Sequence, residues 1–282
     1  MQPSIDFPPL HISALLHKHG LSPRKGLGQN FLIDEEYLQR IVDAADIETD
    51  QAALEVGAGL GSLTRRLAAR AGRVVAVELD LNLIPPLREV IGDNEKVKIV
   101  AGDILQLDPA QLMGEGGYVV VANIPYYITS ALFRHLLETP LMPRRMVLTV
   151  QSEVAARICA PAGQLSLLAL SVQVYGQPRL LFTIPASAFY PSPKVDSSIL
   201  RVDLYPQPLI PRENLDTFFR LTKAGFSQKR KMLHNSLCAG LAWPRERVDE
   251  LLNSTGIDPS RRAQTLSMQE WRALTEQYIR LK

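Results

Sequence analysis

Leu54-Glu55-Val56-Gly57-Ala58-Gly59-Leu60-Gly61-Ser62-Leu63-Thr64 joins a short apolar run to the start of a helical pattern through a glycine-rich turn. Glycines in such a turn let the backbone bend tightly and approach a ligand, and the first N–H groups of the following helix are unpaired. A strand, a glycine-rich turn and a helix in this order are typical of α/β proteins that bind nucleotides. Taken alone, Gly-x-Gly-x-Gly fits a cofactor site and a structural turn equally.

The same unit recurs along the first half of the chain. Repeated strand, turn and helix patterns predict a mostly parallel, twisted sheet with helices on both faces. Beyond Pro161 a helical stretch precedes two more strand-like segments, which complete the sheet, with an antiparallel hairpin as one arrangement. The predicted strands are Ala52–Val56, Arg73–Glu78, Val97–Ala101, Gly117–Ala122, Met146–Gln151, Arg179–Ile184 and Ser198–Tyr205.

The last quarter of the chain has a different character. Three prolines within 206–211 predict a semi-rigid linker, because proline removes the backbone donors that a helix or a sheet needs. Everything beyond the linker has helical spacing. We therefore expect an N-terminal extension at 1–24, an α/β domain at 25–205, the linker at 206–211 and a small all-helical domain at 212–282.

Composition bounds the function. A chain of 282 residues that is 46% hydrophobic and 21% charged predicts a globular protein with one large and one small domain. We find neither a spanning segment nor a secretory leader and expect a cytoplasmic protein. Cys159 and Cys238 lack partners at metal-ligand spacing, so we expect buried free thiols and no metal. From residue 194 onward, 15 Lys+Arg face 10 Asp+Glu, so a basic appendage follows a body of net charge −3, which suits binding of a polyanion.

Polar side chains stand at the ends of four successive predicted strands. Glu78 follows Gly57 by 21 residues, where a carboxylate can accept both hydroxyls of a ribose. Asp103 follows the third strand, where it could accept a hydrogen from an adenine amino group, and Asn123 follows the fourth. Each acid alone is as well explained as a surface acid or a helix cap. Because the carboxyl ends of parallel strands form the ligand-binding edge of such sheets, the set indicates a site for an adenosine-bearing ligand.

Asn123-Ile124-Pro125-Tyr126 indicates the chemistry. Acceptors on the Asn123 side chain and the Ile124 carbonyl, aimed at both hydrogens of an adenine N6, would favour the pyramidal, nucleophilic amine, and Tyr126 could stack on the base. An isolated Asn-x-Pro-Tyr is more often an ordinary turn. In this chain the motif has a role beside a methyl donor and none in hydride transfer. Since Ser62 follows Gly61 where a dinucleotide fingerprint has its third glycine, we expect S-adenosylmethionine rather than NAD.

In this order the motifs resemble the ribosomal RNA adenine N6,N6-dimethyltransferase family, and within it the bacterial small-subunit branch. The resemblance runs from about Gly20 to the C-terminus. Its further markers are Lys25-Gly26-Leu27-Gly28-Gln29-Asn30-Phe31-Leu32, Gln151-Ser152-Glu153-Val154-Ala155-Ala156-Arg157, Phe189-Tyr190-Pro191-Ser192-Pro193-Lys194-Val195-Asp196-Ser197 and Phe226-Ser227-Gln228-Lys229-Arg230-Lys231.

The resemblance implies a Rossmann-like, seven-stranded methyltransferase domain followed by a small helical domain that contacts RNA. It implies that the catalytic residues Asn123, Ile124, Pro125 and Tyr126 hold the target adenine, with Phe189 as a second stacking face. It implies that the cofactor-binding residues are Gln29, Asn30, Leu32, Gly57, Gly59, Glu78, Asp103 and Asn123. On pattern alone, the stretch from Gln29 to Leu32 is instead a loop before a helix capped at Asp34.

The RNA side follows from the resemblance too. Lys229, Arg230 and Lys231 lie in a helical pattern with Phe226, where we expect these cations to meet phosphates and the aromatic ring to stack on RNA. A charge run of this kind is more often a solvated helix face. Lys229 replaces a common arginine of the family, which keeps the charge but not the bidentate geometry. The first twenty residues extend beyond the usual bacterial start, with no role assigned.

The implied reaction is dimethylation of N6 on two adjacent adenines in the 3′-terminal loop of 16S ribosomal RNA. The implied partner is the small ribosomal subunit during ribosome biogenesis, and we expect a monomeric enzyme. Two alternatives remain open: the large-subunit dimethyltransferase branch that confers antibiotic resistance, which shares the Asn-Ile-Pro-Tyr motif, and a noncatalytic assembly or nucleic-acid-binding factor.

Overall fold

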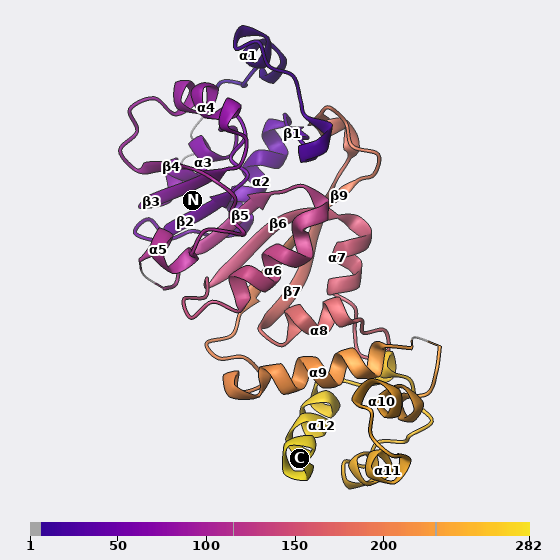
Figure 1. Cartoon of the computed structure of the whole chain (residues 1–282). Helices are drawn as coiled ribbons and strands as arrows, with labels where there is room; N and C mark the ends of the chain where they lie inside the picture. Colours follow the sequence, from indigo (N-terminus) through magenta and orange to yellow (C-terminus); the bar gives the residue numbers. More distant parts are fainter. Residues whose placement is uncertain (1–6, 115, 229) are drawn as a thin grey trace. The chain divides into compact units, whose positions relative to one another are not determined.

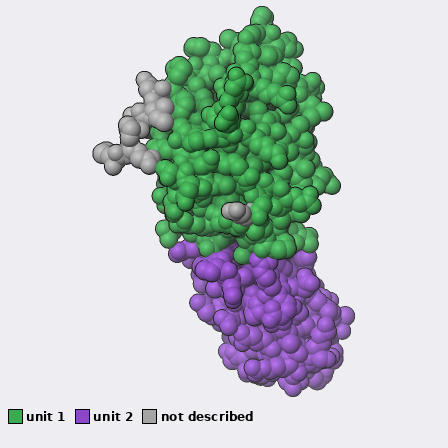
Figure 2. Space-filling view, turned by 90° about the vertical axis from the view of Figure 1, so that its left-hand side faces the viewer, with its two compact units in different colours: residues 1–155, 179–204 green, residues 156–178, 205–282 purple. Residues whose placement is uncertain are grey.

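The structure is a computed structural model that describes residues 7–114, 116–228 and 230–282. Within them the chain divides into two compact units, coloured separately in Figure 2. The first unit holds the sheet, and the second is helical. The first unit ends at Leu204, one residue before our predicted boundary. Residues 156–178, which we assigned to the first domain, belong with the helices of the second unit.

The first unit is built on a seven-stranded sheet in the order β4-β3-β2-β5-β6-β9-β7 (Figure 1). The five strands from β2 to β6 all run parallel to one another, whereas β9 runs antiparallel to β6. This confirms the predicted α/β class and all the predicted strands, with ends moved by at most three residues. The bounds are β2 Ala52–Val56, β3 Arg73–Glu78, β4 Val97–Ala101, β5 Val119–Asn123, β6 Arg145–Gln151, β7 Gly176–Ile184 and β9 Ser197–Leu204.

The helices that follow the strands cover the sheet because alternate strand residues point to one face. Ala53, Val74 and Val119 share such a face and pack with Leu38 and Leu67 in one buried apolar cluster. Asp34 caps its helix as predicted, since its side chain accepts the N–H groups of Glu36 and Tyr37. The helices that begin in this unit are α1 Ile12–Lys18, α2 Glu35–Ala45, α3 Thr64–Arg70, α4 Ile84–Ile91, α5 Pro109–Met113, α6 Thr129–Leu137 and α7 Ser152–Ile158.

A second, two-stranded sheet connects distant parts of the first unit. Strand β1 (Phe31–Leu32) pairs antiparallel with β8 (Phe189–Tyr190), which puts Leu32 opposite Phe189. Two motifs that lie far apart in sequence are thereby brought together beside the large sheet. Helix α1, which the sequence patterns did not predict, packs Ile12, Leu15 and Leu16 into this region.

The second unit is formed by helices around apolar faces. Trp271 and Phe218 are fully buried in it, and Ser267 with Glu270 forms a capping box at the start of the last helix. Its helices are α8 Leu167–Gln173, α9 Leu215–Phe226, α10 Leu233–Leu241, α11 Arg245–Ser254 and α12 Met268–Leu281. In the described part of the chain, no helix combines the length and the apolar character that crossing a membrane requires.

Candidate active site

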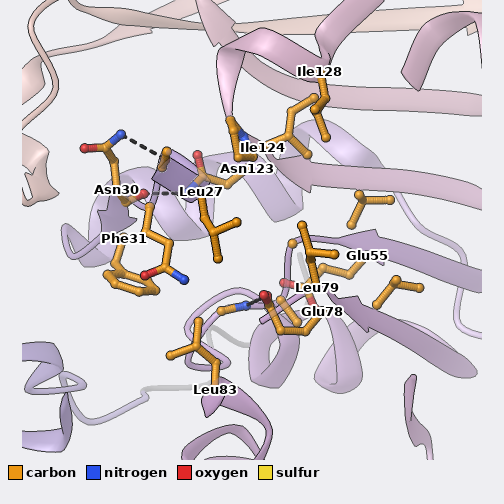
Figure 3. A pocket seen from close by; sticks show the side chains of 18 of the residues that line it. Leu27, Asn30, Phe31, Glu55, Glu78, Leu79, Leu83, Asn123, Ile124 and Ile128 are labelled. Atoms are coloured by element: carbon orange, nitrogen blue, oxygen red, sulfur yellow. Dashed lines mark hydrogen bonds between the residues drawn. The ribbon is translucent and has the colours of Figure 1, made fainter. Parts of the chain in front are cut away.

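One cavity at the carboxyl ends of β2, β3 and β5 collects the predicted site residues of the first unit (Figure 3). Strand register brings these ends together, because Val56 pairs with both Val77 and Ala122. The cavity encloses about 1400 Å³ of empty space, its open mouth included. Its lining includes every predicted cofactor and adenine residue: Gln29, Asn30, Leu32, Gly57, Gly59, Glu78, Asp103, Asn123, Ile124, Pro125, Tyr126 and Phe189.

Glu78 closes the cavity at the end of β3 and is 6% exposed. Its Oε2 accepts the N–H of Gly59 at 2.7 Å, and its Oε1 accepts the N–H of Asp80 at 2.8 Å. Burial raises the pKa of Glu78, while these two backbone hydrogen bonds act to lower it. Each carboxylate oxygen keeps a further lone pair, so the side chain can still accept the two hydroxyls of a ribose.

Asp103 lies two residues after the end of β4 and takes part in two features of the geometry. Its Oδ1 accepts the N–H of Leu105 at 2.9 Å, which fixes the turn. The same side chain lines the cavity. The turn-stabilising role and the ligand role, which the pattern left as alternatives, are therefore compatible at this residue.

Asn123 ends β5, and its orientation is set by a residue far away in sequence. Its Nδ2 donates to the backbone carbonyl of Asn30 at 3.2 Å, so Asn30 and Asn123 lie together in Figure 3. With the nitrogen held there, Oδ1 makes no hydrogen bond to any described residue. This leaves the amide oxygen as an acceptor for an incoming amine.

Tyr126 and Phe189 supply the aromatic surfaces of the cavity. The Tyr126 hydroxyl lies 2.7 Å from the hydroxyl of Ser197, and burial raises the pKa of Tyr126. Phe189 is 3% exposed and belongs to β8. Both rings are therefore held by other parts of the first unit.

The structure also adds a residue that sequence reasoning missed. Glu55 lies in the middle of the β2 run, lines the cavity and is 1% exposed. Burial raises its pKa to about 8, and its Oε2 finds no hydrogen-bond partner among the described residues. Its position inside an apolar strand would have been a usable signal, because a buried acid is costly and is common at functional sites.

These features fit an adenosine cofactor. Glu78 offers acceptors for a ribose, and Glu55, whose raised pKa keeps its carboxyl group neutral at pH 7, forms part of the cavity wall. No three His, Cys, Asp or Glu residues are grouped as metal ligands within the described ranges. Cys159 and Cys238 are not joined in a disulfide and are only partly buried, so our expectation of buried thiols was wrong.

The predicted RNA contacts lie in the second unit and differ from our expectation. Arg230 and Lys231 are exposed, but they lie in the turn between α9 and α10 rather than on a helix, and Lys229 is outside the described residues. Phe226 does not point outward for stacking on RNA, because its ring stacks on Trp271 with centroids 5.9 Å apart.

Comparison with known proteins agrees with this geometry. Residues 20–280 match the family model described as Ribosomal RNA adenine dimethylase. The chain belongs to this family. It is accordingly an S-adenosylmethionine-dependent rRNA adenine dimethyltransferase.

Relatives of this dimethylase support the assignment over most of its length. A protein of Dehalococcoides mccartyi strain CBDB1 named Ribosomal RNA small subunit methyltransferase A is 44% identical and covers 94% of this chain and 91% of its own. One of the same name from Pelotomaculum thermopropionicum is 43% identical and covers 96% of each. Among solved structures, the 23S rRNA methyltransferase ErmE has a TM-score of 0.72 at 29% identity, over 88% of this chain and 99% of its own.

A dimethyladenosine transferase from Plasmodium falciparum has the same fold. Its TM-score is 0.77 at 24% identity, over 89% of this chain and 98% of its own. The predicted Rossmann-like methyltransferase fold with a C-terminal helical region is thereby confirmed.

Proposed function

We propose that this enzyme dimethylates N6 of two adjacent adenines in the 3′-terminal loop of 16S ribosomal RNA, acting on the small ribosomal subunit during ribosome biogenesis. The names of the relatives that cover more than nine-tenths of the chain support the small-subunit substrate. The proposal places the enzyme in the cytoplasm as a monomer, with Arg230, Lys231 and Lys229 as phosphate contacts.

The observation that carries the proposed catalytic role is the hydrogen bond from Asn123 Nδ2 to the Asn30 carbonyl. It directs Oδ1 of Asn123 toward an incoming base as an acceptor. Accepting one N6 hydrogen on Asn123 and the other on the Ile124 carbonyl favours the pyramidal amine, whose lone pair is free to attack. N6 would gain the methyl carbon as the bond between that carbon and the sulfur breaks, and the surplus N6 proton would then pass to solvent. The site therefore needs no general base at the moment of transfer, because it stabilises the reacting geometry.

The remaining residues have positioning roles. When bound, S-adenosylmethionine supplies a methyl group activated by a positively charged sulfur. Glu78 binds its ribose and Asp103 its adenine, while Gln29, Asn30, Leu32, Gly57 and Gly59 enclose the rest of the cofactor. Tyr126 and Phe189 hold the target ring between them, which orients the amine for an in-line approach. An adenine must leave its stack to enter, which favours a loop as target.

The proposal is tested by transfer of labelled methyl groups from S-adenosylmethionine to unmethylated small subunits, followed by nucleoside analysis. We expect N6,N6-dimethyladenosine from the wild type and a loss of at least 100-fold in rate with Asn123→Ala, a typical effect of removing one preorganised hydrogen-bonding group. Asn94→Ala is the matched control, because Asn94 is exposed in a turn before β4.

Three other outcomes would contradict parts of the proposal. Methylation of large-subunit RNA instead would assign the chain to the resistance branch. Cofactor binding without transfer to either subunit would require another RNA. Full support of ribosome maturation by Asn123→Ala would favour the noncatalytic assembly role.

A further inference from the structure

The segment that precedes α2 is fixed to the cofactor cavity from two sides. On one side, Ile12, Leu15 and Leu16 of α1 form a buried apolar cluster with Phe31, Leu60 and Leu83, and these last three residues line the cavity. Between α1 and β1 the chain forms the loop Arg24–Asn30. The loop has no apolar anchor of its own, because the short helix Lys25–Leu27 buries none of its residues.

The second attachment is Asp80, which no sequence motif singled out. Asp80 is 5% exposed. Its Oδ2 accepts Nε2 of Gln29 at 2.9 Å, and its Oδ1 accepts Nη1 of Arg24 at 3.2 Å. The N–H of Arg24 in turn donates to Oε1 of Gln29 at 2.8 Å. Both polar atoms of the Gln29 amide are therefore engaged within the protein, so this side chain serves to hold the loop.

Asp80 also contacts the proposed ribose site directly. Its backbone N–H donates to Oε1 of Glu78 at 2.8 Å. Burial alone would raise the pKa of Asp80, but hydrogen bonds from Asn82 and Gln29 and the nearby Arg24 charge lower it. The side chain is thus a carboxylate, the form that can accept from Gln29 and Arg24 at the same time.

A continuous path runs from Glu78 to Asn123 through this residue. Asp80 holds Gln29, and the next residue, Asn30, holds the Asn123 amide with its carbonyl. The loop approaches Pro125 closely on its other side, since a Cβ on Gly28 would lie 2.9 Å from the Pro125 Cβ. The two ends of the cavity are therefore linked through one buried carboxylate.

We propose that Asp80 is a positioning residue that holds the loop Arg24–Asn30 closed over the cavity. It thereby fixes the position of the cofactor-binding end of the cavity relative to the amine-binding end. This inference rests on the proposed function in taking S-adenosylmethionine as the ligand. Asp80 itself touches neither cofactor nor substrate in this role. It acts through Gln29 and Glu78.

The test begins with calorimetric binding of S-adenosylhomocysteine, which needs no RNA. We expect Asp80→Asn and Asp80→Ala to weaken binding about tenfold or more, because each loses hydrogen bonds to a charged group that hold the loop beside the cofactor. We expect the kcat of methyl transfer to fall as well, since Asn30 no longer holds Asn123 in place. Asp93→Asn is the matched control, because Asp93 is exposed.

A charge-exchange experiment separates positioning from a general effect on folding. In Asp80→Asn the single amide oxygen is required where Oδ1 accepts from Arg24 and Asn82, so the new NH₂ group faces the NH₂ group of Gln29. Gln29→Glu sets two carboxylates against each other. The double substitution exchanges amide and carboxylate and restores the hydrogen bond, with Arg24 N–H still accepted at position 29. We expect the double variant to bind S-adenosylhomocysteine several-fold more tightly than either single variant.

Two results would overturn the inference while leaving the proposed function standing. One is wild-type affinity and kcat in Asp80→Asn. The other is a double variant no better than the worse single variant, which would make Asp80 a folding residue only. If the wild type itself bound no S-adenosylhomocysteine, the proposed cofactor chemistry would fail and this inference with it.

Discussion

The backbone N–H of Gly59 donates a 2.7 Å hydrogen bond to Oε2 of Glu78, so the glycine loop after β2 is joined directly to the acidic end of β3. With Asp80 on Oε1, both oxygens of Glu78 are acceptors for backbone donors. An amide at this position has only one acceptor atom and would turn an NH₂ group toward one of these N–H groups.

Glu78→Gln is therefore expected to weaken cofactor binding by at least tenfold, although the side chain keeps its size. The cost combines a lost acceptor with a buried donor that has no partner, roughly 1–3 kcal/mol. Titration with S-adenosylhomocysteine measures this loss of affinity. Glu95→Gln, an exposed acid, should bind as the wild type does, and equal affinity of the two variants would refute the role of Glu78.

Gly28→Ala is expected to reduce methyl transfer at least tenfold. Gly28 has a φ of +61°, and its missing Cβ would lie 2.9 Å from Pro125 Cβ, so a side chain would push the loop away from Asn123. Gly26→Ala, two residues earlier, meets nothing within 4 Å and should retain activity. Initial rates with small subunits compare the two, and equal rates would contradict close contact between this loop and Pro125.

Glu55 predicts a specific dependence of stability on pH. The folded protein keeps the Glu55 proton up to about pH 8, whereas the unfolded chain releases it near 4.5. Stability from this group is thus present below about pH 4.5 and is lost as the pH rises to 8. Glu55→Gln removes the titration, so the free energy of unfolding of the variant minus that of the wild type should rise by up to about 1.4 kcal/mol per pH unit.

Thermal unfolding of Glu55→Gln, wild type and the exposed-acid control Glu95→Gln, between pH 5 and 8, measures this difference. Only for the Glu55 variant should the free energy of unfolding increase relative to that of the wild type as the pH rises. If the difference between these two free energies stayed constant across the range, Glu55 would be ionised in the folded protein.

Tyr127 is expected to bind RNA rather than cofactor. Its side chain is 65% exposed at the edge of the cavity, next to Tyr126. A base beside a flipped adenine has lost a stacking neighbour, and an exposed ring can replace it at about 1–3 kcal/mol per base. We expect Tyr127→Ala to raise the KM for small subunits about tenfold, with Tyr127→Phe near wild type and cofactor affinity unchanged in both. An unchanged KM would exclude stacking.

Arg230 and Lys231 are exposed in the turn between α9 and α10. Replacing both with glutamine is expected to weaken RNA binding and to flatten its dependence on salt, because two fewer phosphates are neutralised. Measurement of subunit binding from about 50 to 200 mM salt gives the slope. A parallel shift with an unchanged slope would mean that neither side chain contacts phosphate.

Local patterns were sufficient for most of the fold. Runs such as Gly117–Ala122 predicted buried strands because they are apolar and short, and Asp34 predicted a helix start because its side chain can cap. Glu78, Asp103 and Asn123 were expected to lie together because the ends of parallel strands share one edge of the sheet, and all three line the one cavity. The position of a residue along its strand was therefore enough to predict where it lies.

The features that the sequence did not predict depend on contacts between residues that are distant in sequence. Asp80 and Gln29 are 51 residues apart, and nothing local to either residue indicates the other. Helix α1 was missed because it depends on apolar contacts with Leu60 and Leu83 rather than on caps of its own. Phe226 was assigned to RNA because a basic cluster follows it, whereas Trp271 is its partner.

The chain passes between its two compact units three times, after Ala155, after Pro178 and after Leu204. During synthesis, residues 156–178 therefore leave the ribosome before β9 of the first unit has been made. The other residues of their own unit begin only at Tyr205 and are synthesised later. A nascent chain stopped at Leu204 holds all the residues of the first unit together with an orphaned fragment of the second. For the same reason no single continuous piece of gene encodes the helical unit, because its residues 156–178 are separated from the rest by residues 179–204.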